Sequence, residues 1–135
     1  MEKSRGFTLI EMMVVIVIVG ILAAVSISIM HGRVNSAKWA EGKAMTGTIA
    51  RALRIHIVEM GDDFANVPTL EQLGFEAGHL SGTYFSGGES GAGDFSWAIN
   101  SNSPINFLVT TMAPASVRTP SQITLDHTGT FTETP

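Results

Sequence analysis

Residues 5–30 read RGFTLIEMMVVIVIVGILAAVSISIM, and this stretch decides the fold. Between residues 7 and 30 the one ionisable side chain is that of Glu11. A helix of that length measures about 36 Å, enough to cross a hydrocarbon core of roughly 30 Å. An ordinary secretory signal, cut here near residues 24–26, has a shorter apolar stretch of about 7–15 residues. The run therefore predicts a transmembrane helix.

Basic residues flank both ends of the apolar run. Lys3 and Arg5 precede it and favour a cytoplasmic N-terminus, whereas Arg33, Lys38 and Lys43 follow it. Because the positive-inside rule compares the two flanks, these residues leave the orientation of the helix open.

Charge is distributed unevenly over the remaining chain. Residues 31–60 carry five basic and two acidic side chains, a net charge of +3, whereas residues 61–135 carry eight acidic and one basic, a net charge of −7. A basic middle and an acidic C-terminal part can attract each other between copies, and the acidic part argues against a nucleic-acid groove there. The sequence contains no cysteine, which excludes disulfides and thiolate chemistry.

Glu11 needs a partner, because a carboxylate inside an apolar span costs on the order of 3 kcal/mol or more. It can lie at headgroup level, where the helix dipole favours an anion. Alternatively, a cut after Gly6 would give Phe7 a new, largely protonated α-amino group. At a spacing of four residues, amine and carboxylate would share a helix face, and a neighbouring copy could offer its own amine. Such an ion pair would also fix the axial register between copies.

The string RGFTLIE at residues 5–11, followed by about twenty apolar residues, resembles the processing and methylation motif of type IV pilins and type II secretion pseudopilins. The resemblance implies that a membrane aspartyl peptidase, the prepilin peptidase, cuts between Gly6 and Phe7 and N-methylates Phe7. It also implies that Glu11 guides docking into the growing filament. Many major members have a proline late in the apolar run, where this chain has Ser26-Ile27-Ser28.

Gly20 and these serines are expected to loosen the helix instead, since a serine hydroxyl can bond the carbonyl four residues earlier. Whether the helix melts during assembly, and whether the chain is a major or a minor subunit, stay open.

Residues 31–60 continue with helical periodicity, and their apolar stripe is predicted to bury against the C-terminal part. Arg51 and Arg54 lie off the stripe and are expected to point to solvent or to an acidic neighbour. Three glycines favour bends or a soft joint around residues 31–36, and Gly61 is expected to end the helix. The stripe consists of Met45, Ile49, Leu53 and Ile57 with Ala52, and the glycines are Gly32, Gly42 and Gly47.

Residues 61–135 predict a globular head with an antiparallel sheet. Residues 68–74 are typical of one helical turn, with Thr69 and Gln72 as a capping box and Gly74 as its stop. Beyond them the apolar period changes to two, which indicates strands with one buried face. Two predicted turns are Asn100 to Pro104 and Asp126 to Gly129, and the second leads to a last strand that contains Phe131. The strands before it are predicted at Gly82 to Phe85, around Phe95, Trp97 and Ile99, around Ile105, Phe107 and Val109, and around Ile123 and Leu125. The predicted fold class is therefore α+β, with a long N-terminal helix packed on a small C-terminal antiparallel sheet, and this is also the pilin-like architecture that the resemblance implies.

Candidate ligand sites are sparse. Calcium is possible at the Gly-rich acidic loop 87–94, with Asp94 and Asp126 as weak candidate ligands and residues 62–63 as further ones; the resemblance implies such a head-domain site in major pseudopilins. A solvated loop is the simpler interpretation, and no cofactor is predicted. Trp39, near the membrane boundary, is expected to be an interfacial or inter-subunit contact. The four histidines, His31, His56, His79 and His127, show no metal-ligand spacing.

No catalytic set of nucleophile, base and orienting group emerges, so an enzyme is not expected. We expect a cleaved leader at 1–6, a transmembrane and assembly half of the helix at 7–30, an amphipathic half at 31–60 and the head at 61–135.

The predicted function is that of a structural subunit of a type IV pilus or pseudopilus. Its partners would be further copies of itself, prepilin peptidase, the inner-membrane assembly machinery and the lipid bilayer. It would be a single-pass inner-membrane protein before assembly and then part of a periplasmic pseudopilus or extracellular pilus. Alternatives are a monomeric inner-membrane-anchored periplasmic binding module, or a minor pseudopilin that primes or tips the filament of type II secretion or DNA uptake.

Overall fold

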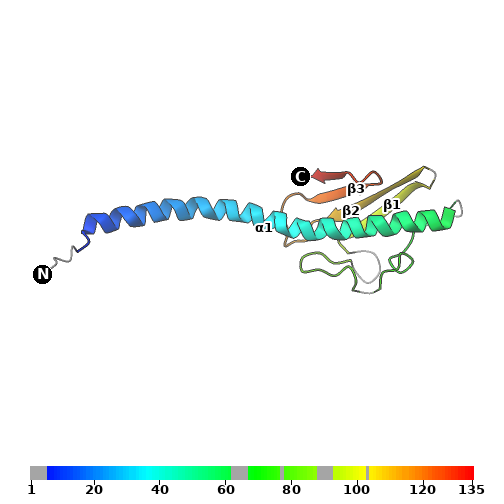
Figure 1. Ribbon diagram of the computed structural model, residues 1–135, viewed down its shortest axis with the longest axis horizontal. Coiled ribbons are helices and arrows are strands. Elements are labelled where there is room, and N and C mark those ends of the chain that lie inside the picture. Colours follow the sequence, from blue (N-terminus) through cyan, green and yellow to red (C-terminus); the bar gives the residue numbers. More distant parts are fainter. Residues whose placement is uncertain (1–5, 62–66, 77, 88–92, 103) are drawn as a thin grey trace. The chain divides into compact units, whose positions relative to one another are not determined.

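The computed structural model describes residues 6–61, 67–76, 78–87, 93–102 and 104–135. Helix α1 (Leu9–Met60) is followed by strands β1 (Phe95–Asn102), β2 (Ile105–Met112), β3 (Gln122–Asp126) and β4 (Phe131–Thr134), as Figure 1 shows. The predicted α+β class, a long N-terminal helix followed by an antiparallel sheet, is confirmed. The chain forms two compact units, residues 1–34 and 35–135, and α1 contributes residues to both.

Helix α1 begins and ends at recognisable caps. The hydroxyl of Thr8 accepts the backbone N–H of Glu11 at 3.3 Å, which satisfies one of the free donors of the first turn. Gly61 has a φ of 57°, the left-handed conformation that commonly terminates helices, so the predicted stop is confirmed. The hydroxyl of Ser26 donates to the carbonyl of Leu22 at 2.8 Å, the back-bond that the sequence predicted. Residues 31–36 remain within α1, and the boundary between the two units falls at Val34 and Asn35.

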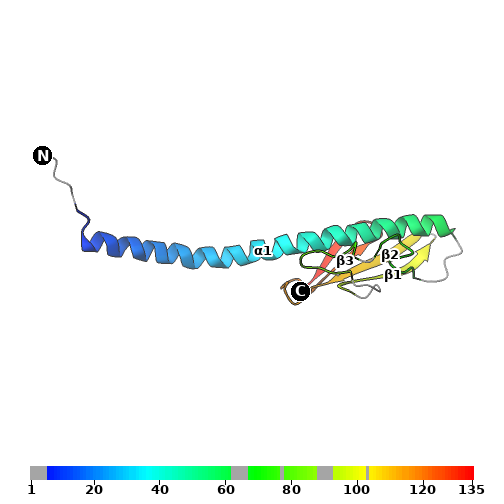
Figure 2. The same cartoon turned by 90° about the horizontal axis from the view of Figure 1, so that it is seen from below.

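The four strands form an antiparallel meander in the order β1-β2-β3-β4. Phe95 pairs with Thr111, Val109 pairs with Leu125, and Leu125 pairs with Phe131. The register of β1 against β2 shifts between Ile99 and Ser101, so the alternation of side chains is interrupted there. Figure 2 shows these strands on one side of the C-terminal half of α1.

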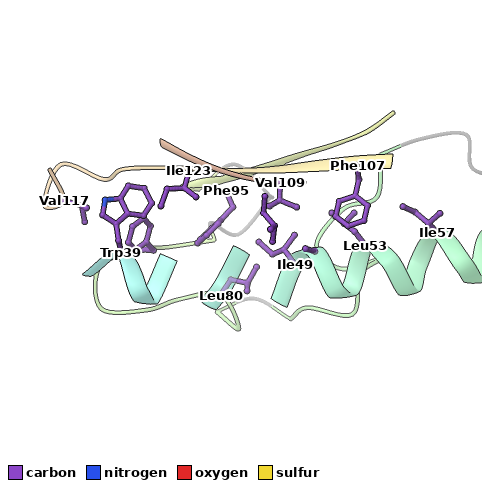
Figure 3. Packing of buried hydrophobic residues seen from close by; sticks show 13 residues of the cluster. Trp39, Ile49, Leu53, Ile57, Leu80, Phe95, Phe107, Val109, Val117 and Ile123 are labelled. Carbon is purple, nitrogen blue, oxygen red and sulfur yellow. The ribbon is translucent and has the colours of Figure 1, made fainter. Parts of the chain in front are cut away.

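The core of residues 35–135 lies between α1 and the inner face of the sheet. In Figure 3, Ile49, Leu53 and Ile57 point from the helix towards the strands. All three are at most 2% exposed, so the predicted stripe is confirmed at these positions. The sheet contributes alternate residues, as a period of two requires. The buried strand residues are Phe95, Phe107, Val109, Ile123 and Leu125.

The predicted strand over Gly82 to Phe85 is wrong. The segment makes a tight turn in which the Gly82 N–H donates to the Phe85 carbonyl at 2.8 Å, and Ser81 and Ser86 form an isolated bridge. The backbone donors of Tyr84 and Phe85 bond to the carboxylate of Glu41 on α1. Because a helix side chain takes these donors, they are not available for a sheet ladder.

The turn at residues 68–74 is confirmed in its details. The Thr69 N–H donates to the Gln72 side-chain oxygen at 2.9 Å, and the Gln72 N–H donates to the Thr69 hydroxyl at 3.3 Å. This reciprocal pair is a capping box. Gly74 has a φ of 83°, and the Phe75 N–H reaches the Leu70 carbonyl at 2.9 Å, which closes the turn in a Schellman arrangement.

Candidate functional site

The processing motif lies at the exposed N-terminal end of the described chain. Phe7 is 71% exposed and precedes the first helical residue, Leu9. Glu11 is exposed and occupies the third helical position behind its cap, Thr8. In the uncut chain, in which Gly6 precedes Phe7, Phe7 therefore lies outside the helix. The pairing of the Phe7 amine with Glu11, within one copy or between copies, stays a prediction. An uncovered peptide bond after Gly6 is what a protease at the membrane requires.

The first half of α1 presents apolar side chains on every side. Its exposed side chains include Ile16 at 66%, Ile21 at 61% and Leu22 at 62%. Within α1, a window of 18 residues has a mean hydropathy of 2.9, which makes the helix long and apolar enough to cross a membrane. A helix that is hydrophobic all round has to be covered by lipid or by other helices.

The second half of α1 holds the head through Glu41. One of its carboxylate oxygens accepts the N–H groups of Tyr84 at 2.8 Å and of Phe85 at 3.0 Å. These bonds, first that from Phe85 and then that from Tyr84, lower the pKa of Glu41 from its ordinary value of 4.5, against a small opposing effect of desolvation. No periodic pattern of residues predicts this contact, because it joins a helix carboxylate to an irregular loop. We call Glu41 with residues 81–86 the clasp.

The clasp residue Phe85 packs in an aromatic cluster with Trp39 and Phe95. This packing differs from what the sequence predicts for Trp39 and adds a role for Gly42. Trp39 is 4% exposed and its ring lies 5.1 Å from that of Phe85, so it is a core residue of its own chain and not an interfacial or inter-subunit contact. Its indole N–H has no hydrogen-bond partner among the described residues. Gly42, expected only to weaken the helix, is where Phe85 packs: a Cβ there would lie 2.8 Å from the ring.

A buried hydroxyl pair joins helix and sheet. Thr46 and Thr111 are both 0% exposed, and their hydroxyl oxygens are 2.5 Å apart. The Thr46 hydroxyl also lies 2.6 Å from the Gly42 carbonyl, to which it donates, so Thr111 is the donor to Thr46. Neither residue was predicted, because apolar periodicity does not single out a threonine. The usable signal was their position, since Thr111 continues the inward alternation after Phe107 and Val109.

Basic residues of α1 bind the head within one chain. Lys43 forms an ion pair with Glu133 at 2.7 Å, and Lys38 donates to the Ser116 carbonyl at 2.6 Å. Arg54 is exposed, as expected, and its guanidinium also donates to the His127 carbonyl at 2.7 Å and lies 5.8 Å from the ring of Phe107. Arg51 is exposed, as expected.

The two weak calcium candidates serve as backbone caps at different places. One Asp94 oxygen accepts the Ser86 N–H at 2.9 Å. Asp126 accepts the Thr128 hydroxyl at 2.6 Å and the N–H groups of Thr130 and Thr128, each at 2.9 Å, and these bonds lower the pKa of Asp126 in that order. These bonds and Gly129, with a φ of 91°, close the predicted β3–β4 hairpin.

The sheet register separates the two carboxylates. The Met112 N–H donates to the Asp94 carbonyl, whereas Asp126 pairs with Leu108. Four residues along β2 correspond to about 13 Å, so Asp94 and Asp126 do not share one site. Within the described ranges, no group of three or more His, Cys, Asp or Glu residues could hold a metal ion. Residues 62–63 and 88–92, named for the same site, lie outside those ranges.

Comparison with known proteins adds to this geometry. Residues 1–27 match the family model described as the prokaryotic N-terminal methylation motif. The chain is 44% identical over 76 residues to the type II secretion system core protein G of Pseudomonas aeruginosa, a match that covers 56% of this chain and 50% of that protein. It is 37% identical over 71 residues to the protein of the same name from Dickeya chrysanthemi, covering 53% and 44%. The chain thus spans about half the length of the curated relatives it matches. No solved structure gives a significant match.

Proposed function

We propose that the chain is a member of the pilin and pseudopilin family and, within it, a structural subunit of a type II secretion pseudopilus. The observation that carries the proposal is the processing motif at residues 5–11, set at the start of an uncovered apolar helix. The choice of a pseudopilus over a surface pilus is supported by the two relatives, both of which are type II secretion system core proteins G. The proposed role is mechanical and involves neither catalysis nor a cofactor.

In this proposal the chain starts as a single-pass protein of the bacterial inner membrane with its head in the periplasm. Prepilin peptidase removes residues 1–6 and methylates the amine of Phe7. Methylation keeps the positive charge, so the amine can still pair with a carboxylate. Glu11 of one copy then pairs with the Phe7 amine of a neighbour, and the inner-membrane assembly machinery adds subunits to the filament. Such an ion pair, once removed from water, fixes the axial position of one copy against its neighbour, because an unpaired charge in that setting costs free energy.

The apolar half of α1 supplies the reason for polymerisation. Its side chains require lipid or sister helices around them, whichever state the chain is in. Leaving the bilayer is therefore possible only when other copies take the place of the lipid. The head stays folded throughout, since its core uses residues of α1 beyond Asn35.

Mass spectrometry of the mature N-terminus tests the proposal. In cells with an active peptidase, the chain is expected to begin at a methylated Phe7. A Gly6→Val variant, which places a bulky side chain at the cut, is expected to keep the leader. An intact leader on the unmodified chain in such cells would rule out the proposed processing.

A further inference from the structure

We propose that the loop of residues 113–121 is a lipid-binding site, at which Arg118 contacts the phosphate of an anionic phospholipid headgroup on the periplasmic side of the membrane. The inference rests on the proposed function, in which the apolar half of α1 anchors the chain in the membrane. It adds a contact between the head and lipid headgroups, which that anchoring does not require. Its starting point is a charge count: Arg118 is the one lysine or arginine among residues 61–135, which carry eight acids. We call residues 113–121 the proximal loop.

The proximal loop is fixed to α1 at the first turn of the second unit. The Asn35 side chain bonds this loop twice: its amide nitrogen donates to the Thr119 carbonyl, and its oxygen accepts the Arg118 N–H at 2.9 Å. Lys38 donates to the Ser116 carbonyl at 2.6 Å. Val117 is 6% exposed and belongs to the core. The backbone of the loop is therefore held in place while the Arg118 side chain remains exposed.

Chain length alone keeps this turn near the membrane. The apolar run ends at Met30, and Asn35 follows five residues later. Those five residues cover about 8 Å as a helix and at most about 18 Å when fully extended. Whatever the angle between the two units, Asn35 and the loop bonded to it stay close to the headgroup layer, within reach of its electrostatic potential.

The chemistry of the proximal loop fits an anionic interface. Apart from Arg118 it has no charged residue, and its other members are small, apolar or hydroxyl-bearing, with prolines at 114 and 120. An arginine fork matches the geometry of a phosphate, and its apolar stem can lie along lipid. Among described acids nearby, Glu133 is paired with Lys43 and Asp94 accepts the Ser86 N–H. Arg33, tethered three residues beyond Met30, adds a second positive charge to the same layer.

Fluorescence quenching in reconstituted vesicles tests the site. Because the chain lacks cysteine, Ala115→Cys gives a single labelling position within the proximal loop, three residues before Arg118, and Glu59→Cys gives one near the C-terminal end of α1. The labelled full chain is placed in phosphatidylcholine vesicles with or without phosphatidylglycerol, and a nitroxide on the lipid headgroup serves as the quencher. Stronger quenching at position 115 than at 59, enhanced by phosphatidylglycerol and reduced by salt, is expected.

Variants of Arg118 identify the contact. Arg118→Gln is expected to weaken the headgroup contact of position 115 about fivefold, the usual effect of one basic side chain at an anionic surface. Arg118→Lys is expected to restore most of the contact, whereas Arg51→Gln, an exposed basic residue further along α1, is expected to change nothing. Equal quenching in Arg118→Gln and the parent chain, or equal quenching with and without phosphatidylglycerol, would overturn the proposal.

Alkaline extraction of the same vesicles separates this failure from a failure of the proposed function. If the chain leaves the vesicles, the anchoring itself is wrong. If it stays inserted and position 115 is not quenched, the lipid site is wrong while the anchored subunit stands.

Discussion

Glu41 is the residue through which α1 holds an otherwise irregular loop. Its carboxylate accepts two backbone N–H groups, so a single helix side chain replaces the ladder that a strand would have provided. Glu41 is partly exposed, and solvent screening reduces what these charge-assisted bonds contribute to stability. Gly82 contacts the same carboxylate, and a Cβ there would lie 2.1 Å from its oxygen.

We expect Glu41→Gln to destabilise the full chain in detergent by about 1 kcal/mol, because an amide is a weaker acceptor than a carboxylate. The effect depends on pH. The pKa of Glu41 is lower in the folded state, so its contribution is present above the unfolded value of about 4.5 and is lost as the pH falls through the folded value. Urea unfolding at pH 7 and at pH 3.5 measures the free energy of unfolding of both chains. Between these two pH values the Glu41→Gln variant should lose less stability than the parent chain, and an equal loss in the two chains would contradict this role. Glu59→Gln, at an exposed position, is the control.

The pair of Thr46 and Thr111 leads to a second residue-scale prediction. Thr46→Val leaves the Thr111 hydroxyl buried without its acceptor, and a cost of about 1–2 kcal/mol is expected. Replacing both threonines by valine removes the orphaned donor and acceptor together, so the double variant should be more stable than the single one. A double variant whose loss equals the sum of two single losses would show that the two hydroxyls do not act as a pair.

At the scale of elements, the long helix, the strand segments of the sheet with their last hairpin and the capped turn followed from the sequence. They followed because local signals and burial agree there: apolar spacing, caps such as Thr69, and turn residues such as Asp126. The clasp could not be predicted in the same way. Its bonds join residues more than 40 positions apart through a side chain, and no periodicity records such a contact. The burial of Trp39 could not be predicted for a related reason: its ring neighbour Phe85 belongs to the clasp and lies far from it in the sequence, whereas its position near the membrane boundary favours an interfacial contact.

Two glycines of α1 provide a matched test of this packing. A Cβ at Gly47 would meet nothing within 4 Å, so Gly47→Ala is expected to stabilise the chain by about 1 kcal/mol through helix propensity. A Cβ at Gly42 would lie 2.8 Å from the ring of Phe85, which is itself 1% exposed and cannot move freely. Gly42→Ala should therefore destabilise by about 1–3 kcal/mol. Thermal unfolding followed by near-ultraviolet circular dichroism measures both, and equal shifts would contradict the proposed close contact.

For the whole molecule, only the part of the candidate site that lies in one contiguous sequence motif could be predicted. Gly6, Phe7 and Glu11 lie within six residues, so their spacing carries the information. The proposed partner of Glu11 lies in another chain, and the proximal loop depends on the fold of the head. Neither is encoded as a local pattern.

We expect Glu11→Ala to insert into the membrane normally and to be processed, yet to give several-fold fewer filaments, because the neighbour's amine loses its counter-ion. Shearing of filaments followed by immunoblotting measures assembly, and alkaline extraction measures insertion. Glu59→Ala, which removes an acid at the far end of α1, is the control. Normal filament yield for Glu11→Ala would count against the inter-subunit pair.

The sharing of one helix between two compact units has a practical consequence for making a water-soluble fragment. The head cannot be cut free at the end of α1, because Ile49, Leu53 and Ile57 fill the inner face of its sheet. Asn35, Lys38 and Trp39 secure its other end. A truncation that keeps residue 35 onwards should fold in water, whereas one that starts beyond residue 50 should yield an aggregating sheet with its apolar face uncovered.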